Sequence, residues 1–173
     1  MTDWYALRVR SNFEKVVQQE LRQLDVEDFL PVYLKKSRWS DRVKTLEMPL
    51  FPGYVFGRFD PRYRLPILKL PGVVHILGNS SGPIPVDDAE LQDIRRSVES
   101  GLPVTPWPFL TTGDSVVVED GALSGLQGIL LRVKDSCRIV VSLMLLQRSV
   151  AVELDRASIR PVRGSSSGSG PSN

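Results

Sequence analysis

The chain has 173 residues, 42% of them hydrophobic and 24% charged, which is the composition of a globular protein with a core of its own. Its 22 Lys and Arg residues against 20 Asp and Glu residues leave a net charge of +2, which excludes a general coating of nucleic acid by charge alone. Any contact with nucleic acid must therefore come from a local basic patch.

The single cysteine, Cys137, can form neither an internal disulfide nor a zinc site, which indicates a reducing compartment. The N-terminal residues lack the apolar stretch of a signal peptide, and the apolar run IVVSLMLL is too short to span a bilayer. We therefore expect a cytoplasmic protein that makes no membrane contact.

The first residues predict a strand followed by a helix. Residues 4–10, WYALRVR, alternate in a way that predicts a half-buried strand with Arg8 and Arg10 on a basic outer face. The apolar side chains that follow recur at helical spacing. Ser11 and Glu14 have the spacing of a capping box, which predicts that the helix begins there.

Residues 28–51 predict a β-hairpin with a polar, basic tip around Trp39. Five cations stand there against the one acid Asp41: Lys35, Lys36, Arg38, Arg42 and Lys44. Such a tip suits contact with nucleic acid, but hairpin tips are also commonly basic for solubility alone.

The next predicted strand, residues 54–59, is apolar on both faces. We expect one parity to pack in the core, and its members are Phe51, Val55 and Phe59. The other parity combines aromatic, aliphatic and cationic side chains, which is the composition of a protein–protein hot spot; it contains Leu50, Tyr54, Phe56 and Arg58. A strand covered on both sides would have the same composition, so core and interface both remain open here.

The rest of the first half predicts a short helix over 65–70, a strand over 73–77, a short edge strand and a final helix. Asp87 is the expected N-cap of that helix, and Gly101 follows its end. The order of elements predicts an α+β domain over 1–102, with an antiparallel sheet flanked by helices.

The second half differs from the first in composition and periodicity. The prolines of 103–109 predict a semi-stiff linker. Residues 110–163 contain five short β-rich runs separated by Gly, Asp and Ser, which predicts a small SH3-like barrel. Residues 164–173, GSSSGSGPSN, have the composition of a flexible tail.

Several of these segments together resemble one family. WYALRVR, FEKVVQQEL, LFPGYVF and PGVVHILG, in this order, resemble the N-terminal domain of the NusG transcription elongation and antitermination factors. GDSVVVEDGALSGLQGILLRV resembles a KOW motif, with Gly125 and Gly128 at the positions of its turn and its glycine. The resemblance covers residues 4–162.

One segment departs from the general members of the family. Where these have a short IFGR segment, this chain has LMLLQRSVAVEL, residues 143–154, which is two residues longer and lacks the glycine. In this respect the chain resembles the specialised NusG paralogues that act as antiterminators on particular operons.

The resemblance implies a function without cofactor or metal. It implies that a face with Leu50, Tyr54, Phe56 and Arg58 binds the β′ clamp helices of RNA polymerase. It further implies contact with upstream or non-template DNA, for which the candidates are Arg8, Arg10, Asn12, Lys35 and Arg38. The KOW domain would recruit a second partner, such as a ribosomal protein or a termination factor, and we expect the chain to be a monomer.

Two other classes of function were weighed against this one. An enzyme is disfavoured because His75 is the only histidine and lies in an apolar strand, while the acids from Asp87 to Asp93 fit helix capping better than acid–base catalysis. A ribosome- or RNA-associated KOW protein is the alternative, with Arg132, Lys134 and Arg138 as candidate contacts. Neighbouring acids dilute that charge, which disfavours a footprint dominated by phosphate contacts.

Overall fold

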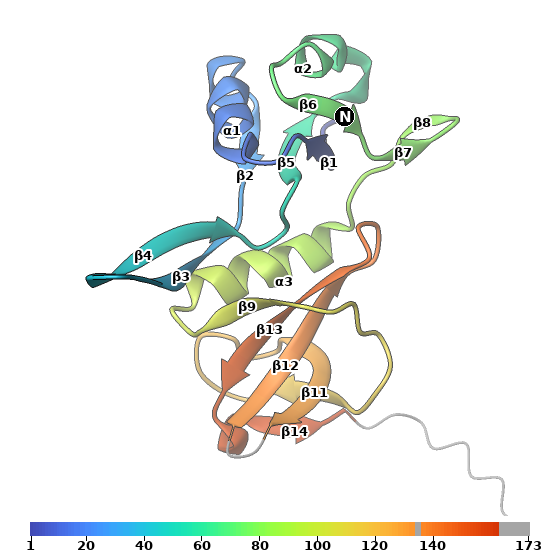
Figure 1. Ribbon diagram of the computed structural model, residues 1–173. Coiled ribbons are helices and arrows are strands. Elements are labelled where there is room, and N and C mark those ends of the chain that lie inside the picture. Colours follow the sequence, from blue (N-terminus) through green and yellow to red (C-terminus); the bar gives the residue numbers. More distant parts are fainter. Residues whose placement is uncertain (134–135, 163–173) are drawn as a thin grey trace, which may run out of the picture.

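The computed structural model describes residues 1–133 and 136–162 of the chain. Figure 1 shows an upper unit built by the first half, a lower unit built by the second half, and a long helix between them. All strand pairs of the described residues are antiparallel, so the predicted α+β class is confirmed. No helix in these residues is long and apolar enough to cross a membrane.

The upper unit contains a four-stranded sheet with the strand order β2-β5-β1-β6. Its elements are β1 (Asp3–Val9), α1 (Glu14–Gln23), β2 (Glu27–Phe29), β5 (Tyr54–Phe59), the 3-10 helix η1 (Pro61–Tyr63), α2 (Leu65–Leu68) and β6 (Val73–Ile76). The two central strands, β1 and β5, have apolar residues at consecutive positions. Central strands lose water on both faces, which explains that composition.

The prediction that β1 is half-buried was wrong. Its residues from Trp4 to Leu7 are buried on both faces of the sheet, because α1 covers one face and α3 and the lower unit cover the other. Only Arg8, which is partly exposed, and Arg10, which is exposed, retain the predicted basic character at the end of the strand.

Two hairpins project from the upper unit (Figure 1). The larger one is formed by β3 (Val32–Trp39) and β4 (Arg42–Pro49), which confirms the predicted hairpin with its tip beside Trp39. The smaller one, β7 (Gly78–Asn79) and β8 (Gly82–Pro83), replaces the predicted edge strand.

The helix between the two units is α3 (Asp88–Glu99). Its N-cap is Asp87, as predicted, and the side chain of this residue accepts a hydrogen bond of 3.1 Å from the backbone N–H of Glu90. Gly101 follows the helix with φ +78°, a conformation that favours glycine.

The lower unit is a six-stranded sheet with the order β14-β10-β11-β12-β13-β9, consistent with a KOW or SH3-like domain. Its elements are β9 (Val104–Trp107), β10 (Ser115–Val118), β11 (Gln127–Val133), β12 (Ser136–Leu143), β13 (Arg148–Leu154), the 3-10 helix η2 (Arg156–Ser158) and β14 (Ile159–Pro161). A Cβ atom on Gly128 would lie 2.6 Å from the carbonyl oxygen of Val140, so the pairing of β11 with β12 requires glycine there.

The stretch expected as a linker, 103–109, contributes a strand instead. β9 pairs with β13, and Val104 is buried between the two units. Beyond β9, the N–H of Leu110 donates to the hydroxyl of Ser149 at 3.1 Å, and its carbonyl accepts from Ser142 at 2.9 Å. These bonds hold the segment against the lower sheet.

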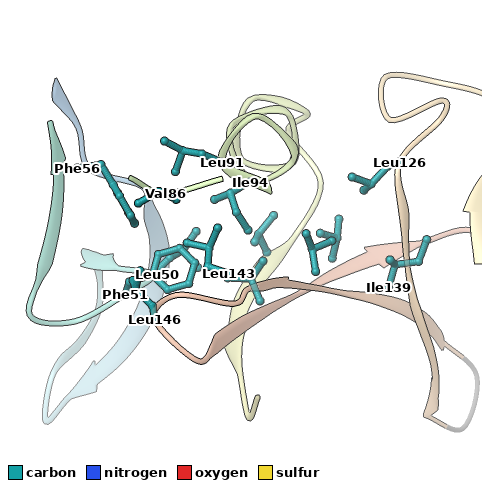
Figure 2. Packing of buried hydrophobic residues seen from close by; sticks show 14 of the residues in the cluster. Leu50, Phe51, Phe56, Val86, Leu91, Ile94, Leu126, Ile139, Leu143 and Leu146 are labelled. Carbon is teal, nitrogen blue, oxygen red and sulfur yellow. The ribbon is translucent and has the colours of Figure 1, made fainter. Parts of the chain in front are cut away.

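Two buried clusters hold the molecule together. The smaller one lies between α1 and the sheet of the upper unit, and it includes Tyr5, Leu7, Val17, Leu21, Val55 and Phe59. The larger one runs from the opposite face of that sheet, past α3, into the lower unit. The two units therefore share a core in this conformation (Figure 2).

Candidate functional site

The face of the upper sheet that points toward α3 carries the residues expected to bind a protein. Phe56 lies at its centre, with its ring centroid 6.0 Å from that of Phe51 and 6.1 Å from that of Phe29. Trp4 and Ala6 of the neighbouring strand belong to the same cluster. The face is therefore an aromatic surface built from β1, β2, β5 and the turn before β5.

The four residues expected at a polymerase interface differ in their exposure. Leu50 and Phe56 are 1% and 0% exposed, whereas Tyr54 is half-buried. Arg58 is exposed at the end of β5, and its guanidinium lies 3.6 Å from the carboxylate of Glu27. The parity argument thus brings Tyr54 and Phe56 to one face, but most of that face is covered.

Phe51 does not follow the predicted parity. We expected it to pack with Val55 and Phe59, but those two residues lie in the cluster on the α1 side, while Phe51 packs against Phe56 on the other side. The alternation of a strand does not extend to Phe51, because this residue lies in the turn before β5 begins at Tyr54.

The lower unit covers the aromatic face. Leu143 and Leu146, at the turn between β12 and β13, lie beside Leu50 and Phe51 (Figure 2). This turn belongs to the segment in which the sequence departs from the general family pattern. Within this apolar run, Leu143 and Leu146 are buried, whereas Met144 is exposed.

Helix α3 contacts the lower unit through polar groups as well. The guanidinium of Arg96 donates to the carbonyl oxygen of Ser124 at 2.7 Å. The backbone N–H of Met144 lies 3.4 Å from the carboxylate of Glu90, which accepts a hydrogen bond from it. These contacts and the shared apolar cluster define the interface between the units, which we call the closing interface.

Burial raises the pKa of the Glu90 carboxyl above its ordinary value; the hydrogen bond from Met144 opposes this rise, and the nearby carboxylates of Asp87 and Asp93 add to it. If the lower unit moves away, Glu90 regains water and its pKa returns toward the ordinary value. The closed form then binds the proton more tightly than the open form.

We therefore expect acid to favour the closed form. The contribution is fully present below the ordinary pKa of Glu90 and is lost as the pH rises through the raised value. The fraction of closed molecules, measured by an interdomain distance between two labels, should increase as the pH falls from neutral toward that range. The Glu90→Gln variant should show a weaker dependence, and an equal dependence would exclude Glu90 as its source.

Arg8 and Tyr54 link the expected DNA surface to the expected polymerase surface. The guanidinium of Arg8 lies over the Tyr54 ring, 5.0 Å from its centroid. Gly53 has φ +84°, and a Cβ atom there would collide with the Arg8 guanidinium. The absence of a side chain at Gly53 therefore makes room for Arg8 on Tyr54.

Replacing Gly53 by alanine should lower the free energy of unfolding by about 1–2 kcal/mol from backbone strain, and by more if Arg8 is displaced. Gly57→Ala is the matched control, since its φ is not in the left-handed region and a Cβ atom there would meet only ordinary contacts of 3.5 Å and longer. Urea denaturation of both variants measures the difference. Equal stability of the two variants would contradict this explanation of Gly53.

The capping box expected at Ser11 is not formed. α1 begins at Glu14, and its carboxylate accepts a hydrogen bond of 3.0 Å from the backbone N–H of Gly53 instead. Asn12 stands just before the helix with φ +68°. The buried Glu14 thus ties the start of α1 to the turn before β5, a long-range contact that local spacing could not predict.

The other candidate DNA contacts lie on separate elements. Arg10 and Asn12 are exposed on the connection between β1 and α1. Lys35 and Arg38 are exposed on β3, three positions apart, so their side chains point to opposite faces of the hairpin. Trp39 shares the face of Lys35, and the Lys44 ammonium lies 5.3 Å from the centroid of its indole ring.

Arg95 on α3 is not among the residues that the sequence pattern indicated. Its guanidinium lies 4.5 Å from the centroid of the Phe29 ring and 5.5 Å from that of Trp4. It stands on the helix stripe of Asp88 and Gln92, directly before the Arg96 that contacts the lower unit. Helical periodicity could have separated the two arginines onto different faces, but it could not have identified the aromatic partners of Arg95.

The residues considered for catalysis or RNA binding are dispersed. His75 is exposed on β6, and Asp87 caps α3. Within the described ranges, no group of three or more His, Cys, Asp or Glu residues is placed to hold a metal ion. Arg132 and Arg138 lie on β11 and β12, and Lys134 lies outside the described residues.

Similarities to known proteins cover nearly the whole chain. Residues 2–95 match the family described as "Transcription termination factor nusG". The chain is 30% identical over 168 residues to the transcription termination/antitermination protein NusG of Buchnera aphidicola subsp. Acyrthosiphon pisum, covering 88% of this chain and 92% of that protein. It is 28% identical to the protein of the same name from Yersinia pestis, covering 90% and 94%.

A solved structure described as "Domain interaction in Thermotoga maritima NusG" has the same fold. It superimposes with a TM-score of 0.60 at 20% sequence identity, covering 94% of this chain and 98% of that one. This similarity extends across both units.

Proposed function

Because the chain belongs to the NusG family of transcription termination and antitermination factors, we propose that it binds RNA polymerase through the aromatic face of its upper sheet. The aromatic composition of this face carries the proposal: Phe56, Phe51 and Phe29 form a contiguous surface, with Tyr54 and Arg58 at its edges. Aromatic residues and arginine dominate the energetics of protein interfaces. The partner would be the clamp helices of the β′ subunit.

The closing interface imposes a condition on this binding. Leu50 and Phe56 are fully covered in the closed form, so the lower unit must leave the face before the polymerase can contact them. The protein then alternates between a closed form and an open, binding-competent form. Its apparent affinity is the affinity of the open form reduced by the fraction of molecules that are open.

Bound to the clamp, the protein would act by shifting a population. Contacts with the clamp and with the opposite side of the polymerase cleft, through 71–77, would favour the closed, elongating state of the enzyme over a paused one. The released lower unit would then be free to recruit a second partner, such as a ribosomal protein or a termination factor. Neither step requires a cofactor or catalysis by this chain.

Contact with DNA is the second part of the proposal. Arg8, Arg10 and Asn12 lie near the start of α1, and the basic hairpin extends from the same unit. Exposed arginines can contact phosphates and stack on the bases of a single strand. A photo-crosslinker at Arg10 should label the non-template strand of an elongation complex; absence of labelling with the protein bound would refute this role.

The departure at 143–154 favours a specialised factor, because the residues that distinguish it from the general pattern are those that cover the aromatic face. The alternative is a ribosome- or RNA-associated protein. Affinity purification from a lysate should recover RNA polymerase if the proposal holds, and ribosomal RNA with its proteins if the alternative holds. Transcription through a terminator, with and without the purified protein, then measures the functional effect and its sign.

A further inference from the structure

A pocket of about 530 Å³ opens beside the aromatic face, along α3 from Asp88 to Arg95. Arg95 and Gln92 of α3 line one side, and Trp4 and Arg58 of the sheet line another. None of its lining residues comes from the lower unit. The pocket is therefore open to solvent in the closed form, while Phe56 is covered.

Arg95 is partly buried on α3 and is held by aromatic rings. Its guanidinium contacts the rings of Trp4 and Phe29, which orient it, and it forms no ion pair within the described residues. Its Nε atom is buried and has no hydrogen-bond partner among the described residues. Because this atom is buried, a ligand in the pocket can reach Arg95 only through the part of the guanidinium that lines the pocket.

The charges around Arg95 restrict the chemistry of that ligand. Glu27 is paired with Arg58, but Asp3 and Asp88 also line the pocket. Several acids would repel a phosphate chain, which carries many negative charges. A partner that offers one carboxylate fits the pocket better. The carboxylate would meet Arg95, and a cationic side chain of the same partner would face Asp3 and Asp88. Such a pair belongs to the surface of a protein.

The pocket is joined to the proposed polymerase face by direct contacts. Arg95 lies on Phe29, and Phe29 packs against Phe56. A partner that engages the pocket is therefore positioned next to the residues that it must reach after the lower unit moves away.

We infer that Arg95 is the first docking point for RNA polymerase on the closed form, and that it receives a carboxylate of the partner's acidic side chain. The inference rests on the proposed function and adds an order of events to it. Docking at Arg95 precedes the opening of the closing interface, and the aromatic face is engaged second. Arg95 then controls the rate of association, whereas Tyr54 and Phe56 control the rate of dissociation.

Arg96 supplies a matched control with an effect of the opposite sign. It neighbours Arg95 in sequence and carries the same charge, but it bonds to Ser124 across the closing interface. Arg95→Gln should lower the association rate constant, whereas Arg96→Gln should raise it by weakening closure. A general effect of removing a positive charge from α3 would change both rates in the same direction.

The test is the association rate of the full chain with purified bacterial core RNA polymerase at several salt concentrations. We expect Arg95→Gln to reduce the rate about 3- to 10-fold at low salt, and we expect this difference to shrink as salt screens the docking contact. Wild-type binding together with an unchanged rate for Arg95→Gln would overturn the inference and leave the proposed function intact. Absence of wild-type binding would overturn both.

Arg95→Gln could also lower stability, since the guanidinium packs on two rings. Thermal unfolding of the free protein separates this effect from docking. If the variant is unfolded, Gln92→Glu takes its place, because Gln92 lines the same pocket but is not part of the aromatic face. A slower association for Gln92→Glu at low salt would support the inference, and an unchanged rate would overturn it.

Discussion

Replacing Leu146 with aspartate should open the protein and strengthen its binding to RNA polymerase about 10- to 100-fold. Leu146 is 5% exposed and lies in the cluster shared with Leu50 and Phe51. A carboxylate at this position would be buried without a partner in the closed form, whereas in the open form it could reach water. The closed form is therefore destabilised relative to the open form, and the fraction of binding-competent molecules rises.

The gain in affinity cannot exceed the reciprocal of the fraction of wild-type molecules that are already open. A protein that is already fully open would gain nothing. Met144→Asp is the control in the same turn, since Met144 is 55% exposed and a charge there remains in water. Titration of labelled protein with core polymerase measures both affinities. Unchanged or weaker binding by a folded Leu146→Asp variant would contradict the closing role of this turn.

Truncating Phe56 to alanine should lower the free energy of unfolding by about 3–5 kcal/mol. The side chain is 0% exposed, and its ring packs against those of Phe51 and Phe29. Binding to polymerase should also be lost, but the loss of stability would complicate its interpretation. Urea denaturation measures the first effect, and a cost below about 1 kcal/mol would contradict the central position of Phe56 in the cluster.

Tyr54→Ala separates binding from folding more cleanly. Tyr54 is half-buried at the edge of the same face, under the Arg8 guanidinium. We expect about 2 kcal/mol of binding free energy to be lost, close to a 30-fold weaker affinity for polymerase. Phe109→Ala, at a 39% exposed aromatic position in the lower unit, should bind like the wild type. Equal affinity of the two variants would remove Tyr54 from the interface.

The fold could largely be predicted because the local signals agree with it. The strand at the N-terminus, the hairpin around Trp39, the cap at Asp87 and the β-rich second half all formed as their sequences indicate. Each of these features depends on residues close together in the chain. The resemblance to a KOW motif also pointed to Gly128, and glycine is required where β11 meets β12.

The errors concern contacts between distant segments. The prolines of 103–109 are typical of a linker, but β9 forms there because the free edge of β13 offers backbone partners. Glu14 has the spacing of a capping residue, but it bonds to Gly53, 39 positions away. Phe51 precedes its strand by a turn, and the turn reverses the side on which its ring packs.

The sequence predicted which residues form the candidate site, but not whether they are buried or exposed. The apolar character of Tyr54 and Phe56 indicated a second buried face, and the sequence left core and interface both open. In the closed form the face is core, shared with Leu143 and Leu146 of the lower unit. In the open form that we propose, the same side chains would be an interface. If one face serves both states, as we propose, composition cannot distinguish the two.

The distance between the two units, measured by pulsed electron paramagnetic resonance with and without polymerase, tests this alternation most directly. Spin labels on Gln23 of α1 and Gln127 of β11 would occupy exposed positions on opposite units, in a chain whose buried Cys137 is replaced by serine. We expect one narrow distance distribution for the free protein, and its replacement by longer, broader distances when core polymerase binds. A distribution that stays unchanged in the polymerase-bound protein would show that the aromatic face remains covered and would contradict the proposed binding site.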